Sequence, residues 1–301
     1  MRLRLRGEEI PYPLFTMKGR LRMSGLDEQA ICEIMDDKSL AAIKSEEELI
    51  NHIKSSLNKF DSSISTNFET LTNYDVLRGE LSNLPAIVVT LEGASATGKS
   101  LIALELMYDM AATRFISTDT IRQIIRSMVS RKEYPELFCH TYQAHQYRQV
   151  GPSNLNPVVR GFLAQCETIT PHVLAMTERI LTEGAVAVVE GVHLEPGTLQ
   201  ELSSGVVEIL VNPDVETHQL MFASKHAVGK LKTVSEDSSV RKKEFDSTRV
   251  IQDYMINCAE KSNVPILPFT GYDEARKTVS SIILSKIKKL LSSFEDGVAR
   301  I

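Results

Sequence analysis

An apolar run that leads directly into a glycine-rich turn constrains this chain more than any other feature. Residues 85–93 (PAIVVTLEG) are rich in β-branched side chains, which predicts a strand buried on both faces. The turn that follows, GASATGKS at 93–100, matches the pattern GxxxxGK[ST], and a helix-patterned segment comes next. Backbone N–H groups of such a turn and the positive end of the helix together attract phosphate. The sequence therefore predicts a nucleotide-phosphate site.

Each position of this loop has an expected task. Gly93 and Gly98 permit backbone angles and a close approach that side chains would block. Lys99 is expected to reach the β- and γ-phosphates, and the hydroxyl of Ser100 is expected to bind Mg²⁺. ATP and Mg²⁺ are the cofactors that this pattern predicts. The expected nucleotide-binding residues are Gly93, Ala94, Ser95, Ala96, Thr97, Gly98, Lys99, Ser100 and Leu101.

Four more apolar runs follow, and helix-patterned segments separate most of them. The runs lie at 114–118, 185–191, 206–212 and 264–269. Parallel strands need long crossover connections, and helices are the usual ones. The alternation therefore predicts an α/β fold in which helices cover both faces of a parallel sheet.

Changes in composition and residue pattern along the chain predict two domains. A small N-terminal module with its connection is expected over 1–80, and the main domain over 81–301. We interpret the polar stretch 54–82 as the connection, with some helix in it. A lid is expected near 218–245, and the polar insertion 134–160 lies where a substrate-binding element is expected.

Composition excludes several classes of protein. The 301 residues carry a formal net charge of −5, which argues against a nucleic-acid binder with a basic face. No apolar run approaches the length of a membrane span, and the first residues lack the apolar core of a secretory signal. The four cysteines are scattered, as in reduced cytoplasmic proteins. We expect a cytoplasmic protein whose partner is a small molecule rather than a nucleic acid or a membrane; both a monomer and a homo-oligomer fit the sequence.

Charged residues near the expected strand ends are candidates for catalysis. Asp119 follows the second strand, where it could orient an attacking hydroxyl or help to place Mg²⁺, or merely cap its helix. Arg122 and Arg126 lie one helical turn apart and could hold an anionic substrate. Glu190 ends the third strand, as in the Walker B arrangement that holds Mg²⁺ through water.

Four further residues are weaker candidates. His193 lies just beyond the third strand and either contacts substrate or is a hydrogen-bonded structural histidine. His218, Lys225 and Arg241 belong to the expected lid, which would close over the phosphates and exclude water. The alternative is that this segment is simply a solvated charged face.

These motifs resemble those of the archaeal 2-phosphoglycerate kinases over most of residues 84–270. The resemblance depends on the phosphate loop and on the segments ISTDTIRQIIR, VVRGFLAQCETITPHV, TEGAVAVVEGVHLEPG and FDSTRVIQDYMINCAEKSNVPIL. It implies a P-loop kinase fold and transfer of the ATP γ-phosphate to a hydroxyl of a small phosphorylated acid. Lys99, Asp119 and Arg122 would be the catalytic residues. The family's ATP-cone-like opening is matched by residues 17–35 only in degraded form.

Two departures from the family pattern bear on the acceptor. Met221 stands where the family tends to have an arginine, and Lys225 stands where arginines are common. Softer or fewer cations imply a different layout of anions, and Met221 could pack against a methyl group of the acceptor. One branch of the family phosphorylates the 5-hydroxyl of mevalonate 3-phosphate in archaeal isoprenoid biosynthesis, and we expect that acceptor. The alternative is 2-phosphoglycerate, which gives 2,3-bisphosphoglycerate.

Two functions from other classes stay open at this point. A nucleotide-sensing regulatory protein would bind ATP tightly and turn over every small acid slowly. A polynucleotide or toxin-type kinase would share the same motif layout, but the net charge of −5 counts against it.

Overall fold

The structure is a computed structural model that describes residues 2–5, 7–81, 83–229 and 237–298. The chain divides into two compact units. One unit comprises Met1–Pro85, Glu105–Ala112 and Lys277–Ile301, and the other comprises Ala86–Leu104 and Thr113–Arg276. Within the described residues, none of the helices combines the length and the apolar character needed to span a membrane.

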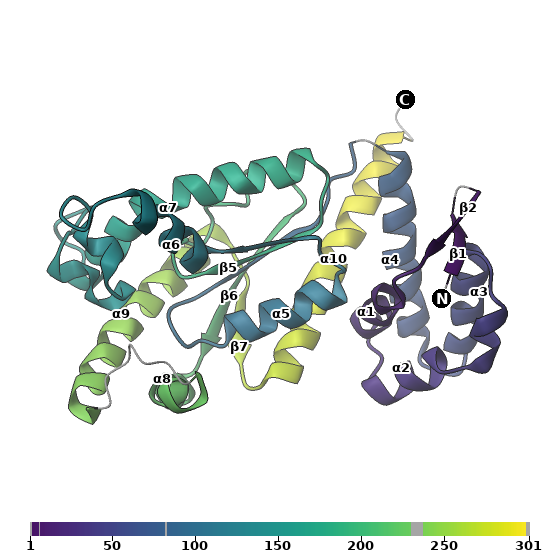
Figure 1. Cartoon of the computed structure of the whole chain (residues 1–301), viewed down its shortest axis with the longest axis horizontal. Coiled ribbons are helices and arrows are strands. Elements are labelled where there is room, and N and C mark those ends of the chain that lie inside the picture. The colour runs from purple at the N-terminus through teal and green to yellow at the C-terminus, as the bar shows by residue number, and fades with distance from the viewer. Residues whose placement is uncertain (1, 6, 82, 230–236, 299–301) are drawn as a thin grey trace. The chain divides into compact units, whose positions relative to one another are not determined.

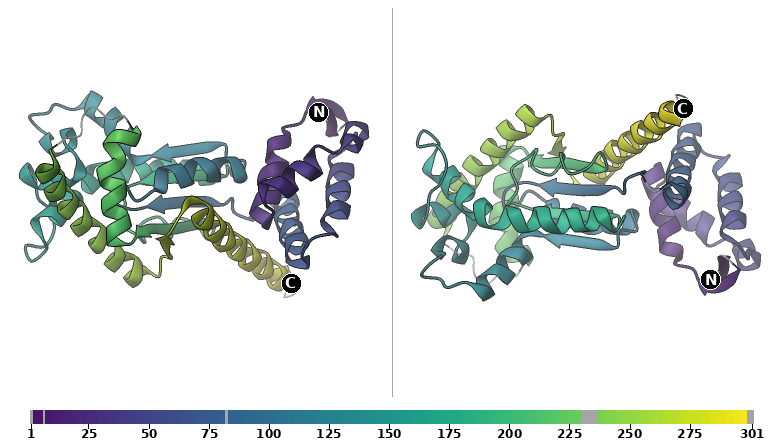
Figure 2. Two further views of the ribbon diagram at one scale, coloured as in Figure 1. Left: turned by 90° about the horizontal axis from the view of Figure 1, so that it is seen from below. Right: turned by 90° about the horizontal axis from the view of Figure 1, so that it is seen from above.

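The larger unit is built on a five-stranded sheet in which every neighbouring pair is parallel (Figure 1). The strand order is β4-β5-β3-β6-β7, and helices lie on both sides of the sheet (Figure 2). This confirms the α/β fold that the alternating pattern predicts. The strands are β3 (Val88–Glu92), β4 (Arg114–Ser117), β5 (Ala187–Gly191), β6 (Val206–Pro213) and β7 (Ile266–Phe269).

The central strand explains why the apolar run before the phosphate loop is continuous. β3 pairs with β5 along one edge and with β6 along the other, and helices lie on both sides of the sheet (Figure 2), so all five residues of β3 are buried. The register places Glu190 beside Leu91 of β3 and beside Ser117 of β4. The carboxyl ends of β3, β4 and β5 therefore meet at one edge of the sheet, where ligands bind in this class of fold.

The helices of the larger unit follow the expected crossovers. Two short 3₁₀ helices, η2 and η3, occupy the polar insertion 134–160, whose last residues begin α7. Apolar side chains from β3, β5, α6 and α7 form one buried cluster, and β6, α7, α8 and α9 contribute to another. The bounds are α5 (Lys99–Asp109), α6 (Thr118–Met128), η2 (Pro135–Phe138), η3 (Thr141–Gln146), α7 (Pro157–Thr182), α8 (Val215–Gly229), α9 (Ser238–Ser262) and α10 (Tyr272–Val298).

The smaller unit has a hairpin and short helices around its own apolar core. Leu21, Ile31, Ile53 and Phe68 are among the fully buried side chains of that core. Part of α5 and most of α10 also belong to this unit. Its other elements are β1 (Arg2–Leu5), β2 (Glu8–Pro11), α1 (Leu14–Ser24), α2 (Glu28–Met35), η1 (Lys38–Ala42), α3 (Glu46–Leu57) and α4 (Ser62–Glu80).

The polar stretch 54–82 is a structural helix rather than a connection. Most of it forms α4, which buries Phe68, Leu71 and Tyr74. Its threonines hide this pattern in the sequence, because their hydroxyls donate to carbonyls one turn back, as Thr70 does to the carbonyl of Thr66 at 2.8 Å. The composition indicated a connection with some helix in it, and α4 occupies most of that stretch.

Candidate active site

The phosphate loop runs from the end of β3 to the first turn of α5. Gly93, Ala96 and Gly98 all have positive φ, at 149°, 67° and 92°. A Cβ at Gly98 would lie only 3.0 Å from the ring of Phe269 and 3.3 Å from Cε of Met221. Glycine is therefore required at Gly98 both by the backbone angle and by the close packing beneath the loop.

Side chains from distant parts of the chain hold this loop. The Ala94 N–H donates to Oε1 of Gln252 at 2.8 Å, and His218 Nε2 donates to the Ser95 carbonyl at 2.9 Å. Lys225 Nζ donates to Oγ of Ser95, also at 2.9 Å. Gln252 belongs to α9, whereas His218 and Lys225 belong to α8. Two of the three lid residues expected from sequence thus contact the same residue of the phosphate loop.

Two lysines bring positive charge to the loop. Lys99 is buried, and its Nζ donates to the Ala94 carbonyl at 3.1 Å. Burial lowers the pKa of the Lys225 ammonium, and the charge of Lys99 acts in the same direction. Burial likewise lowers the pKa of His218, which leaves that side chain neutral. Two ammonium groups that lie near each other repel each other and are partly desolvated. This arrangement therefore indicates a binding site for a multiply charged anion.

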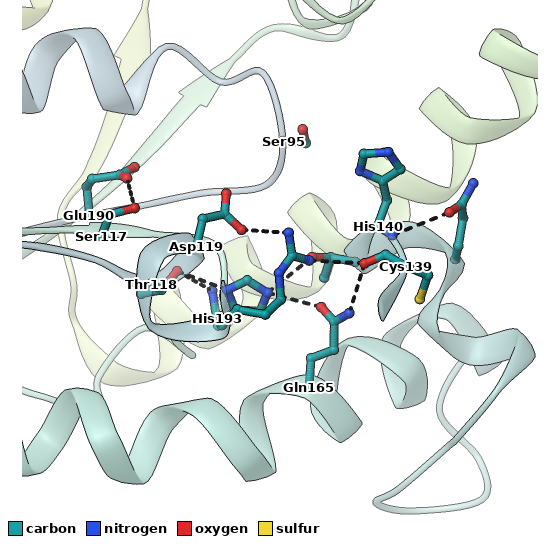
Figure 3. A network of polar contacts seen from close by, with 12 residues as sticks. Ser95, Ser117, Thr118, Asp119, Cys139, His140, Gln165, Glu190 and His193 are labelled. Carbon is teal, nitrogen blue, oxygen red and sulfur yellow. Dashed lines mark hydrogen bonds and ion pairs between the residues drawn. The ribbon is translucent and has the colours of Figure 1, made fainter. Parts of the chain in front are cut away.

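Glu190 connects the phosphate loop to the end of β4. One carboxylate oxygen accepts from Ser100 Oγ at 2.9 Å, and the other accepts from Ser117 Oγ at 2.7 Å. The contact with Ser117 is visible in Figure 3. Hydroxyl and carboxylate oxygens are the donors that Mg²⁺ prefers, so Ser100 and Glu190 fit the ion that the loop pattern implies.

Asp119 and Arg122 form an ion pair on the first turn of α6 (Figure 3). Arg122 Nη2 lies 3.0 Å from Oδ1 of Asp119, whose side chain is 63% exposed and so can be reached by a ligand. Partial burial opposes ionisation, but the positive charges of Arg122, Lys99 and Lys225 help to hold the pKa of Asp119 below its ordinary value. Asp119 does not cap α6, since the cap residue is Ser117 and no side-chain capping bond forms there.

A buried polar network lies behind this ion pair (Figure 3). His193 has no exposed surface, and burial lowers its pKa to about 3, so the imidazole is neutral. Its Nδ1 accepts from Thr118 Oγ1 at 2.9 Å, and its Nε2 donates to Oε1 of Gln165 at 3.0 Å. This placement supports the structural alternative for His193 over contact with substrate. Gly191 leaves room for the Thr118 side chain, because a Cβ at Gly191 would lie 1.8 Å from Thr118 Oγ1.

Two other candidate cations are engaged by the protein itself. The guanidinium of Arg126 lies over the ring of Phe138, 4.8 Å from its centre. Arg241 is buried, donates to the carbonyl of Phe222 and pairs with Glu244 at 2.9 Å. The segment 230–236 of the expected lid lies outside the described residues.

Three residues at the site escaped sequence reasoning. Thr118, Gln165 and Gln252 make the contacts that fix Asp119, His193 and the phosphate loop, yet each sits in an ordinary helical pattern. The only signal was that all three fall inside segments on which the family resemblance depends: Thr118 in ISTDTIR, Gln165 in VVRGFLAQ and Gln252 in VIQDY.

Kinases of the P-loop class place the ATP phosphates and an alcohol acceptor along one edge of a parallel sheet. This chain is an ATP-dependent enzyme of that class, with Mg²⁺ as its metal and a hydroxyl group as its acceptor. The sequence comparisons lead to a narrower group. The chain is 28% identical to the 2-phosphoglycerate kinase of Methanopyrus kandleri over 96% of its own length and 88% of that protein.

Other archaeal relatives carry the same name. The 2-phosphoglycerate kinase of Methanothermobacter thermautotrophicus is 29% identical over 84% of this chain and 81% of the relative. That of Thermococcus kodakarensis is 27% identical over 68% and 67%. These matches confirm the resemblance that the motifs indicate. No family model matches the chain.

Among solved structures, the shikimate kinase of Acinetobacter baumannii in complex with shikimate aligns with a TM-score of 0.39. It is 13% identical and covers 68% of this chain and 94% of its own. The shikimate kinase of Aquifex aeolicus aligns with a TM-score of 0.31 over 71% of this chain and 99% of its own.

Proposed function

We propose that this enzyme transfers the γ-phosphoryl group of ATP to a hydroxyl of a small carboxylic acid that already carries a phosphate. The observation that carries the proposal is the ion pair between the exposed Asp119 and the buried Arg122, at the sheet edge that also holds the phosphate loop. An acceptor hydroxyl that donates a hydrogen bond to Asp119 would lie at this edge, between the end of β4 and the phosphate loop. Arg122, Lys99 and Lys225 supply the positive charge that a doubly anionic acceptor and ATP need together.

The lowered pKa of Asp119 defines what this carboxylate does. An ionised carboxylate accepts a hydrogen bond from the acceptor hydroxyl and orients its oxygen, but a weak base removes the proton late. Phosphoryl transfer passes through a loose transition state that requires positioning and charge neutralisation more than strong base. Lys99 and Lys225, which reach Ala94 and Ser95 of the phosphate loop, would hold the phosphoryl oxygens, and Ser100 and Glu190 would hold the metal. Mg²⁺, when bound, neutralises charge that develops on the transferred group.

As acceptor we propose mevalonate 3-phosphate, phosphorylated at its 5-hydroxyl. The support comes from Lys225, which occupies a position where related kinases commonly have arginine and which reaches Ser95 of the phosphate loop. A lysine is a single point charge, whereas arginine binds a carboxylate or phosphate through two parallel hydrogen bonds. An acceptor with a different spacing of anions is therefore favoured over 2-phosphoglycerate.

Met221 does not add to this support. Its Cε lies near Gly98 beside Phe269, at the β7 side of the sheet, whereas Asp119 follows β4 at the opposite edge. The methionine therefore packs under the phosphate loop and does not face the acceptor side, contrary to the expectation from sequence. Its replacement of arginine concerns the nucleotide half of the site.

The second candidate acceptor is 2-phosphoglycerate, and the names of the archaeal relatives favour it. Both acceptors combine a carboxylate, a phosphate ester and a primary hydroxyl. They differ in the methyl-bearing carbon of mevalonate and in the distance between their anionic groups.

ADP release with a panel of acceptors tests both proposals. The panel contains mevalonate 3-phosphate, 2-phosphoglycerate, mevalonate, glycerate and an RNA with a free 5′-hydroxyl, and Lys99→Met serves as the inactive control. We expect the largest kcat/KM with mevalonate 3-phosphate. A larger kcat/KM with 2-phosphoglycerate would identify 2-phosphoglycerate, and not mevalonate 3-phosphate, as the acceptor. Tight ATP binding without turnover of any acid would instead identify a nucleotide-sensing protein.

A further inference from the structure

Two glutamines in the larger unit are completely buried, and each contacts one half of the site. Gln252 accepts the Ala94 N–H at 2.8 Å through Oε1. Its Nε2 donates to the Val211 carbonyl at 3.1 Å and to Oδ1 of Asn212 at 3.2 Å. The first amide of the phosphate loop after Gly93 is thereby tied to the end of β6.

Gln165 makes a comparable set of contacts on the other side (Figure 3). Its Oε1 accepts from Nε2 of His193 at 3.0 Å, and its Nε2 donates to the Glu136 carbonyl at 2.5 Å. The same Nε2 lies 3.5 Å from the Cys139 carbonyl, which also accepts from Arg122 at 3.1 Å. Gln165 therefore fixes the carbonyl that orients the arginine of the Asp119–Arg122 pair.

A side-chain amide suits both places for the same chemical reason. It presents a donor and an acceptor at fixed separation and carries no charge, so it can bridge two polar groups in a buried place. A backbone donor left without its partner in such a place is costly, so the loop would shift to recover one. Each glutamine is thus suited to hold one functional segment in a single conformation.

We propose that Gln252 and Gln165 are positioning residues with separate duties, Gln252 for the phosphate loop and Gln165 for the acceptor side. This inference rests on the proposed function and extends it. It also gives a task to a segment on which the family resemblance depends. In VIQDY, Gln252 holds Ala94, and Tyr254 donates to Oε2 of Glu195 at 2.5 Å, which connects α9 to the segment EGVHLEPG.

The test exchanges each glutamine for methionine, which has a similar length and no hydrogen-bonding amide. For Gln252→Met we expect the Kd of ATP, measured by calorimetry without acceptor, to rise at least about tenfold. The KM of the acceptor at saturating ATP should stay within about twofold. For Gln165→Met we expect the reverse pattern. Each variant is the matched control of the other, since both remove one buried amide from a helix.

The crossed pattern separates positioning from a general loss of stability. If both variants raise both constants in proportion to their loss of Tm, or if neither changes either constant, the proposal is wrong. If a methionine variant does not fold, the corresponding Gln→Leu variant is measured against the same criteria, because leucine also fills the buried place and removes both hydrogen-bonding groups of the amide.

The outcome is also separable from that of the proposed function. A wild-type protein that binds no ATP refutes the proposed function. If the wild type binds ATP but phosphorylates no acid, the Kd of ATP still decides the duty of Gln252. The duty of Gln165 is then decided by the rate at which phenylglyoxal labels Arg122. We expect labelling several times faster in Gln165→Met and unchanged in Gln252→Met; equal rates in all three proteins overturn the assignment.

Discussion

The candidate site has a nucleotide half around the phosphate loop and an acceptor half around Asp119, and the two halves are built from different parts of the residues. The nucleotide half is mostly backbone, since the phosphate loop takes its shape from glycines with positive φ and from close packing under Gly98. The acceptor half is mostly side chain, since Asp119 pairs with Arg122 beside a buried network of Thr118, His193 and Gln165. The backbone shape of the first half follows largely from local sequence, with side chains of α8 and α9 as supports, whereas the second half depends on residues far apart in the chain.

This difference has a functional consequence. A backbone cradle recognises phosphate in every nucleotide and leaves little freedom for change. A pair of side chains oriented by a network can be redirected by altering one distant residue. We therefore expect relatives of this enzyme to share the nucleotide half and to vary in the acceptor half. The following predictions test that division, from the largest effect to the smallest.

Loss of the Lys99 ammonium should have the largest effect. Lys99→Met keeps the buried alkyl chain and removes the charge, so kcat should fall by at least about 10³-fold because the transferring phosphoryl group loses a fixed cation. Circular dichroism and Tm should show a folded protein. Turnover near that of the wild type in the folded variant would remove the phosphate loop from catalysis.

The Asp119 variant tests the acceptor half alone. Asp119→Asn keeps the size of the side chain and removes the charge that orients the hydroxyl, so kcat should fall by roughly 10²-fold. The Kd of ATP should stay within about twofold, since Asp119 lies at the end of β4 rather than on the phosphate loop. A parallel loss of ATP affinity would show that the two halves are not independent.

The Glu190 variant tests the residue that joins the two halves. Glu190→Gln retains one oxygen toward Ser100 or Ser117 and loses the carboxylate charge, so the Mg²⁺ concentration for half-maximal activity should rise about tenfold. Titration of Mg²⁺ at saturating ATP and acceptor measures it. Asp119→Asn is the control, because its Mg²⁺ requirement should not move; the same defect in both variants at every Mg²⁺ concentration contradicts these roles.

The pH dependence of Lys225 should be the smallest effect. Its pKa is lowered by burial and by Lys99, so the charge is present at low pH and is lost, as pH rises, earlier than for an ordinary lysine. Lys225→Arg keeps its charge throughout, and at about pH 10 its kcat/KM relative to neutral pH should exceed that of the wild type by about threefold. Identical alkaline profiles of the two proteins would exclude Lys225 as the titrating group.

The parts of the molecule that sequence predicted are those with short-range patterns. The five strands follow from their apolar runs, and Lys99, Ser100 and Glu190 follow from a loop pattern and a strand end. The structure brings Ser100 and Glu190 within hydrogen-bond distance, although they are 90 positions apart. The reason is that β3, which leads into the loop before Ser100, is the neighbour of β5, which carries Glu190.

What sequence could not predict depends on packing. Gln252 contacts Ala94 across 158 positions, and nothing in its helical pattern distinguishes it from an exposed glutamine. The sequence fits both a substrate contact and a structural role for His193, and only its burial and its bonds to Thr118 and Gln165 favour the structural role. Met221 was expected at the acceptor, and the tertiary structure places it under Gly98. Each of these depends on which face of an element the fold buries.

The strand order has a consequence for the synthesis of the protein. β3 is wholly buried in the folded protein, yet its two neighbours in the sheet, β5 and β6, are translated long after it, as is the helix that carries Gln252. A ribosome that has completed the phosphate loop therefore displays an unpaired apolar strand next to a loop without its supports. Non-local pairing of this kind is slow and prone to aggregation. Nascent chains should acquire affinity for ATP only after α9 has emerged, and until then β3 is a segment that chaperones would have reason to cover.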